Sequence, residues 1–227
     1  MNRMWSNRSR SSVISWGVQV LRMDSVVEPS CSLSRRLILY MEGPQDRAIL
    51  RAWAYRLLPS VGRRLFDASV ILGGRRPARA VEHFRSVGGL DAGLVGLCVL
   101  DRDDGNQPPL SDSGAPGLEF FTWGRRHIES YLLVSAAIWR TLRISDGDRR
   151  VRRAIDAALP GSVDEAAYDQ IDAKRLLGPN GELPRVVGQP ISAQRVARAT
   201  RWEELHPDVH RLFDRLREGL GIWDLRA

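Results

Sequence analysis

Short apolar runs alternate with amphipathic segments along the chain from about residue 35 onwards. The apolar runs are strand-sized and predict strands at residues 36–41, 68–72, 93–100 and 118–122. Helices are predicted between them at residues 44–57, which Pro44 opens, 77–87 and 126–142. Further periodic apolar positions predict helices at residues 151–159, 164–177, 193–199 and 208–220. This alternation predicts an α/β fold in which helices flank a mainly parallel central sheet, followed by a helical C-terminal region.

The same pattern divides the chain into three parts. Residues 1–34 carry scattered Ser, Arg and Asn, and their short apolar patch is broken by Gly17. We expect them to form a flexible arm or an arm that docks on a partner, unless an over-called start codon has added them. Residues 35–145 are expected to form the α/β core, and residues 146–227 a helical C-terminal extension.

The sequence shows no sign of a membrane span or of secretion. The longest apolar run, residues 92–100, is strand-sized and too short to cross a bilayer. Residues 1–34 lack the long apolar region and the small-residue cleavage site of a signal peptide. The two cysteines, Cys31 and Cys98, are too few for a disulfide framework or a cysteine-based zinc site. We therefore expect a cytoplasmic protein with no membrane partner.

The chain is basic, with a net charge of +7 and a sequence pI near 10.3. Such a charge favours a nucleic-acid partner. The signal is weakened because the cations are almost all arginine, as a genome-wide compositional bias would produce in many proteins. Lys174 is the only lysine. In this composition we interpret Lys174 as retained for chemistry, since arginine cannot replace a compact ammonium that is able to lose its proton.

Acidic residues follow two of the predicted strands. Glu42 comes directly after the first strand, and Asp46 lies in the first turn of the next helix. Asp101 and Asp103 follow the third strand and point the same way while the chain stays extended. Each acid alone is more simply explained as a helix cap or a solvated loop carboxylate. Because ligands gather at the carboxyl ends of parallel strands, these acids together predict a site for Mg²⁺ or Mn²⁺.

These segments resemble the Toprim domain of the OLD-family nucleases. Residues 37–46 form an apolar strand that ends in Glu-Gly and is followed by a helical acid, as in the first Toprim motif, and residues 99–103 end in the Asp-x-Asp of the second. Residues 123–133 are similar to the histidine, apolar, Glu, x, Tyr-Leu-Leu block of the OLD family. Residues 172–178 are similar to the lysine-bearing helix of that family. The resemblance therefore covers about residues 36–178, in the right order.

The resemblance implies a metal-dependent endonuclease that hydrolyses DNA or RNA by a two-metal Toprim mechanism. The implied catalytic residues are Glu42, Asp101 and Lys174, with Lys174 stabilising charge on the scissile phosphate or on the leaving oxygen. The implied ligands of two Mg²⁺ or Mn²⁺ ions are Glu42, Asp46, Asp101, Asp103 and Glu129. In such a site two cations about 4 Å apart activate a water and stabilise the leaving alkoxide.

Arginines near the predicted site are candidate contacts to a nucleic-acid backbone. Arg75, Arg76 and Arg79 follow the second predicted strand, at the same sheet edge as the acids. Arg125 and Arg126 come directly before the His-Ile-Glu sequence of the OLD-like block. We expect these five side chains to bind nucleic acid.

Two features limit how far the resemblance extends. The third Asp of the topoisomerase and primase pattern is replaced by Gly105, which disfavours those activities. OLD-family proteins usually carry an ABC-type ATPase, but the only lysine lies between Ala173 and Arg175, so the chain has no Walker A sequence. The resemblance thus implies an effector of phage defence or of DNA or RNA processing that works with an ABC-type ATPase subunit in trans. The chain could also form a homo-oligomer. The alternative is a catalytically weak Toprim module that acts as a binding or sensing subunit.

Overall fold

The computed structural model of the chain describes residues 36–102, 113–161 and 164–222. Two sequence predictions therefore lie outside the described residues, namely the arm at residues 1–34 and the metal ligand Asp103. None of the helices in the described ranges combines the length and the apolar character that a membrane span requires.

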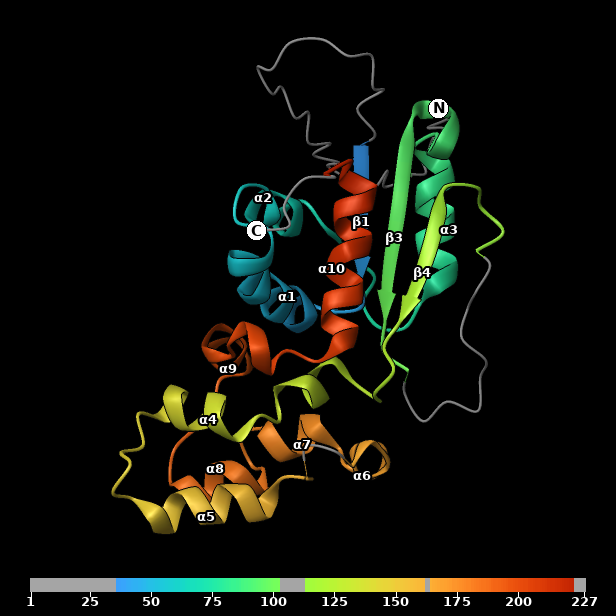
Figure 1. Cartoon of the computed structure of the whole chain (residues 1–227). Coiled ribbons are helices and arrows are strands. Elements are labelled where there is room, and N and C mark those ends of the chain that lie inside the picture. The colour runs from blue at the N-terminus through green and yellow to red at the C-terminus, as the bar shows by residue number, and fades with distance from the viewer. Residues whose placement is uncertain (1–35, 103–112, 162–163, 223–227) are drawn as a thin grey trace, which may run out of the picture.

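A four-stranded parallel sheet forms the centre of the fold (Figure 1). Its strands are β1 (Arg36–Met41), β2 (Val70–Ile71), β3 (Leu94–Leu100) and β4 (Leu118–Thr122), in the order β2-β1-β3-β4. β1 and β3 are nearly continuous apolar runs, as parallel strands covered on both faces require. The predicted α/β class with a mainly parallel sheet flanked by helices is confirmed.

Helices cover both faces of the sheet (Figure 1). One face packs against α1 (Pro44–Leu57), α2 (Gly62–Asp67) and α10 (Pro207–Leu220), through strand residues such as Leu39 and Val99. The other face packs against α3 (Pro77–Ser86), which is followed by the short 3-10 helix η1 (Gly89–Ala92). A Cβ at Gly96 would lie 2.6 Å from Leu118 Cδ1 and 3.1 Å from the Phe84 ring, so glycine allows α3 and β4 to approach β3 closely.

The remaining helices form a lobe beyond the carboxyl ends of the strands (Figure 1). They are η2 (Ile128–Leu132), α4 (Ser135–Leu142), α5 (Arg149–Ala158), α6 (Glu165–Gln170), α7 (Ala173–Leu177), α8 (Glu182–Val187), α9 (Ala193–Ala199) and η3 (Trp202–Glu204). α9 contacts α1, and α10 then returns to contact β1 and β3. One hydrophobic cluster runs from the sheet into this lobe. The boundary predicted at residue 145 therefore does not coincide with a boundary of the hydrophobic core.

Several predicted elements differ from those observed. The helix predicted at 126–142 is broken into η2 and α4, because tertiary contacts of residues 124–131 override the helical pattern. The helix predicted at 164–177 is divided into α6 and α7, and Asp172 starts α7 by accepting the Arg175 N–H at 3.0 Å. The strand predicted at 68–72 is reduced to Val70–Ile71, and α2 precedes it where no helix was predicted.

Candidate metal centre

The candidate site lies where the strand order reverses. The chain leaves β1 for β2 on one side of the sheet and leaves β3 for β4 on the other, so the neighbouring strands β1 and β3 flank a topological switch point. Crevices at such points are the usual ligand sites of open α/β sheets. Glu42 follows β1 and Asp101 follows β3, and the Asp101 N–H donates a hydrogen bond to Glu42 Oε1 at 2.7 Å. The structure therefore brings these two predicted acids together.

Asp101 is the hub of the site and is only 2% exposed. Its Oδ1 accepts the Ile128 N–H at 2.9 Å, and its Oδ2 accepts a hydrogen bond from Lys174 Nζ at 2.6 Å. The Arg75 guanidinium donates to the Asp101 carbonyl oxygen at 2.9 Å. Groups from η2, from α7 and from the loops after β1 and β2 thus converge on Asp101.

Two further acids complete a cluster of carboxyl groups around Asp101. Glu129 is 3% exposed, and its Oε1 accepts a hydrogen bond from Gln45 Nε2 at 3.1 Å. Burial raises the pKa of Glu129 to about 7; Lys174 opposes this rise, whereas Asp101 and Asp46 add to it. Burial, reinforced by the charge of Asp101, raises the pKa of Asp46 to about 6. These mutual effects show that the carboxyl groups share one weakly solvated region.

Lys174 supplies the positive charge of the cluster, and its side chain is 46% exposed. Partial burial lowers the pKa of Lys174, but the hydrogen bond with Asp101 and the charges of Glu129 and Asp46 outweigh it, so the pKa lies above the ordinary lysine value. The role predicted from the sequence for Lys174 is that of a group able to lose its proton. In the structure it is instead a firmly protonated cation beside Asp101.

The donor set fits a divalent cation in its chemistry. Hard carboxylate oxygens are the ligands that Mg²⁺ and Mn²⁺ prefer, and Glu129 Oε2 is buried without a hydrogen-bond partner. As the side chains stand, no three acidic, histidine or cysteine groups in the described ranges form a ready-made metal site. Both Asp101 oxygens are engaged by Ile128 and Lys174. Metal binding would therefore require these side chains to turn toward the ion.

The predicted nucleic-acid contacts lie in different environments. Arg75 and Arg79 lie at the expected sheet edge, but they donate hydrogen bonds to the backbone carbonyls of Asp101 and Leu72, at 2.9 and 2.8 Å. Arg76 is exposed at the same edge, and Arg126 is half-buried. Of these four arginines, Arg76 is the most exposed and therefore the most accessible to a phosphate group.

Arg125 has a structural role rather than the predicted one. Its side chain is 8% exposed, and Nε and Nη2 donate to the two carboxylate oxygens of Glu165 at 3.0 and 2.6 Å. Nη1 donates to the Ser130 carbonyl at 3.0 Å, and the guanidinium lies over the Tyr168 ring, 3.4 Å from its centroid. Because the guanidinium N–H donors of Arg125 bind Glu165 and Ser130, they are not available to phosphates of a nucleic acid in this arrangement.

Replacing Arg125 and Arg76 separately with Ala should separate these roles. Arg125→Ala is expected to lower the free energy of unfolding by roughly 2 kcal/mol, because it removes a buried guanidinium that bonds the half-exposed Glu165 and the Ser130 carbonyl. Arg76→Ala should leave stability unchanged but lower nucleic-acid affinity, reducing the slope of log affinity against log salt by about 1. Denaturant melts and binding titrations at several salt concentrations measure both effects. Unchanged nucleic-acid affinity in Arg76→Ala would show that Arg76 does not contact nucleic acid.

The raised pKa of Glu129 predicts a pH-dependent stability of the metal-free protein. In the folded chain the Glu129 carboxyl group stays protonated up to about pH 7, whereas the ordinary pKa of glutamic acid is 4.5. Stability from this group is thus complete below pH 4.5 and is lost as the pH rises through 7. The loss is on the order of 3 kcal/mol.

Glu129→Gln removes this ionisation, so its unfolding midpoint in chelator should fall less between about pH 5 and about pH 8 than that of the parent. Thermal melts across this range measure the difference. Glu82→Gln, on the exposed side of α3, is the matched control and should behave as the parent. Parallel curves for Glu129→Gln and the parent would contradict the burial argument.

Comparison with known proteins gave one structural likeness. No family model matches the chain, and no curated protein matches it. Among solved structures, the chain is similar to the C-terminal region of the Burkholderia pseudomallei OLD protein, with 18% sequence identity and a TM-score of 0.46. The similarity covers 82% of this chain and 98% of that chain. At this identity and TM-score the likeness assigns no function, which must be argued from the side chains of the site.

Proposed function

We propose that the chain is a metal-dependent nuclease that hydrolyses phosphodiester bonds of DNA or RNA at the carboxyl cluster around Asp101. The observation that carries the proposal is the convergence of Glu42, Asp101 and Lys174 at the switch point of the sheet. Glu129 and Asp46 lie in the same weakly solvated region. The Toprim-like motifs of the sequence single out the same residues independently of these contacts.

Each group has a physical reason for its place in such a site. Glu42, Asp46, Asp101 and Glu129 would hold the ions, with Asp103 as a further proposed ligand. When bound, two Mg²⁺ or Mn²⁺ ions would supply Lewis-acid activation of water and stabilisation of the leaving oxygen. Bound ions would compensate the charge of the clustered carboxylates in this region of low solvation.

Lys174 is suited to stabilise the reacting phosphate. An ammonium has three N–H donors, and one of those of Lys174 is used by Asp101. The half-exposed side chain can therefore offer its other donors to a phosphate, and this donor as well once Asp101 turns toward an ion. A fixed cation at this point stabilises negative charge where it develops in the transition state. Since the pKa of Lys174 is raised, it acts as a cation and not as a general base.

A cleavage assay on several nucleic acids tests the proposal. The purified chain is incubated with single- and double-stranded DNA and RNA in Mg²⁺, in Mn²⁺ and in excess chelator. Cleavage of at least one substrate is expected with metal and none with chelator. Cleavage that persists in chelator, or no cleavage of any substrate in either metal, would contradict the proposal.

The second candidate function is a catalytically weak Toprim module in a binding or sensing subunit. It is favoured by one observation, that both carboxylate oxygens of Asp101 already accept hydrogen bonds, from Ile128 and Lys174. Such a module would bind nucleic acid without cutting it in either metal. The same assay, combined with a binding measurement, therefore separates the two candidates.

We further propose that the nuclease works in the cytoplasm as an effector of phage defence or of DNA or RNA processing, together with an ABC-type ATPase subunit in trans. The proposal rests on the sequence resemblance of residues 36–178 to the OLD-family nucleases. Cleavage measured with and without an ATPase encoded beside this chain tests the pairing. Equal rates under both conditions would contradict it. The mass of the chain in solution decides whether it self-associates.

A further inference from the structure

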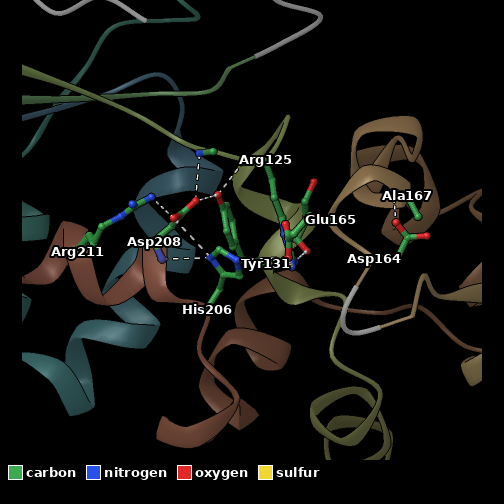
Figure 2. Close-up of polar contacts among 10 residues, drawn as sticks. Arg125, Tyr131, Asp164, Glu165, Ala167, His206, Asp208 and Arg211 are labelled. Carbon is green, nitrogen blue, oxygen red and sulfur yellow. Dashed lines mark hydrogen bonds and ion pairs between the residues drawn. The ribbon is translucent and has the colours of Figure 1, made fainter.

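A buried polar cluster lies on the side of residues 124–131 that faces α10 (Figure 2). We call it the Asp208 clamp, and it consists of Asp208, Tyr131 and the backbone of Gly124 and Arg125. Asp208 is 4% exposed; its Oδ2 accepts the Tyr131 O–H at 2.5 Å and the Gly124 N–H at 3.2 Å. The Tyr131 oxygen in turn accepts the Arg125 N–H at 2.8 Å. The clamp thus ties two consecutive backbone amides and η2 to the first turn of α10.

The fit around Gly124 shows how closely the clamp is packed. A Cβ at this position would lie 2.5 Å from Asp208 Oδ2, so any other residue here would displace the carboxylate. Burial raises the pKa of Tyr131, which keeps its hydroxyl protonated as the donor to Asp208. Buried polar groups that are fully paired in this way fix one arrangement of the chain.

The other side of the same segment reaches the candidate metal centre. Ile128 donates its N–H to Asp101 Oδ1, and Glu129 contributes the buried carboxyl group beside Asp101. Only a few residues separate these groups from Gly124 and Arg125. Rotation of the segment away from α10 would therefore move Glu129 and would remove the hydrogen bond that orients Asp101.

A second tie joins the segment to the helices that carry Lys174. Arg125 binds Glu165 at the start of α6, and His206 Nε2, at the start of α10, lies 3.4 Å from the same carboxylate (Figure 2). α7, which carries Lys174, follows α6 after two residues and contacts η2. The segment therefore has fixed attachments to both α10 and α6.

We propose that Asp208 and Tyr131 are positioning residues for the metal centre, holding residues 124–131 so that Ile128 and Glu129 meet Asp101. The inference rests on the proposed function and adds residues that touch neither the ions nor the substrate. Partners that orient ligands in this way typically change metal affinity by about 10- to 100-fold when they are replaced.

The test uses Tyr131→Phe and Asp208→Asn in the full chain, with two readouts. Calorimetric titration with Mn²⁺ is expected to show affinity about tenfold or more below that of the parent for each variant. Hydrogen exchange of residues 124–131 is expected to become faster, while exchange of β1 and β3 stays unchanged. The metal concentration for half-maximal cleavage should rise by the same factor as the loss of affinity.

Two matched controls separate positioning from general loss of stability. Tyr40→Phe removes another buried tyrosine hydroxyl, which bonds His83 Nδ1 at 3.0 Å on the opposite face of the sheet. Arg211→Ala removes an exposed partner of Asp208 that lies on α10 itself and bonds the other carboxylate oxygen, Oδ1. Both controls should keep the Mn²⁺ affinity and the exchange of residues 124–131 seen in the parent.

The outcomes distinguish this inference from the proposed function. Affinity and exchange in Tyr131→Phe and Asp208→Asn that match the two controls would overturn the inference. A parent chain that binds no Mn²⁺ would refute the proposed metal centre, and the exchange data would then judge the clamp alone. In that case, faster hydrogen exchange of residues 124–131 in the two variants would support the Asp208 clamp. Unchanged exchange would overturn the clamp as well.

Discussion

Asp101→Asn is expected to abolish metal-dependent cleavage, with a loss of about 1,000-fold or more. The substitution removes the carboxylate that lies at the centre of the cluster and bonds Lys174 directly. Asn keeps an oxygen that can accept the Ile128 N–H, so residues 124–131 retain their orientation. The lost ion pair is offset by weaker repulsion among the carboxyl groups. The free energy of unfolding should therefore change by only about 1 kcal/mol or less.

Cleavage rates in saturating Mn²⁺, measured beside denaturant melts, check both parts of this expectation. Asp67→Asn is the matched control, because Asp67, the last residue of α2, forms an exposed ion pair with Arg51 of α1. The control should cut at the rate of the parent. If Asp101→Asn also cut at that rate, Asp101 would have no place in the chemistry.

Lys174→Ala is expected to reduce cleavage by about 100-fold or more, as removal of one preorganised charge contact typically does. Metal affinity should not fall, since Asp101 loses a competing cation. Lys174→Arg should restore only part of the rate, because the planar guanidinium places its charge differently from an ammonium. The single-turnover rate at saturating metal is the quantity to compare.

Arg175→Ala provides the control for Lys174, because Arg175 is the next residue of the same helix and faces a cavity lined by Asp172, Asn180 and Arg185. It removes one positive charge from α7 without touching Asp101. Its single-turnover rate should match that of the parent. Equal losses of single-turnover rate in Arg175→Ala and Lys174→Ala would show that the effect comes from the net charge of the chain and not from the position of Lys174.

The strands and the first acids could be predicted from the sequence because they depend on local pattern. A buried parallel strand is a continuous apolar run, and a polar residue directly after it lies at the carboxyl edge. Glu42 and Asp101 could be paired in this way once β1 and β3 were taken as neighbours. The helical C-terminal region was predictable for the same reason, from its apolar periodicity.

Contacts between distant segments could not be predicted in this way. Lys174 lies 73 residues from Asp101, and it was assigned to the site from its being the only lysine and from the resemblance to a lysine-bearing helix, not from local pattern. Tyr131 and Asp208 are separated by 77 residues, and nothing in the local sequence of α10 marks Asp208 as a partner of Tyr131. The ion pair of Arg125 could not be predicted either, because its partner Glu165 lies 40 residues away on another helix.

The broken helix at residues 126–142 has a related cause. Its apolar periodicity is helical, but the Ile128 N–H is used by Asp101 and the Arg125 N–H by Tyr131. With these contacts the chain bends at residues 124–127, His127 is extended, and the 3-10 helix η2 begins at Ile128. Gln45, which bonds Glu129, was also missed, although its position between Glu42 and Asp46 could have indicated a role in the site.

The most direct test of the proposed metal centre is a crystal structure of the chain grown with Mn²⁺ and recorded at a wavelength where manganese scatters anomalously. The expected result is anomalous density within roughly 2.2 Å of carboxylate oxygens of Asp101 and Glu42, with a second peak about 4 Å away. Lys174 would then point toward the space for a phosphate. Density elsewhere alone, with Lys174 still bonded to Asp101 at saturating Mn²⁺, would contradict a metal-dependent nuclease at this site.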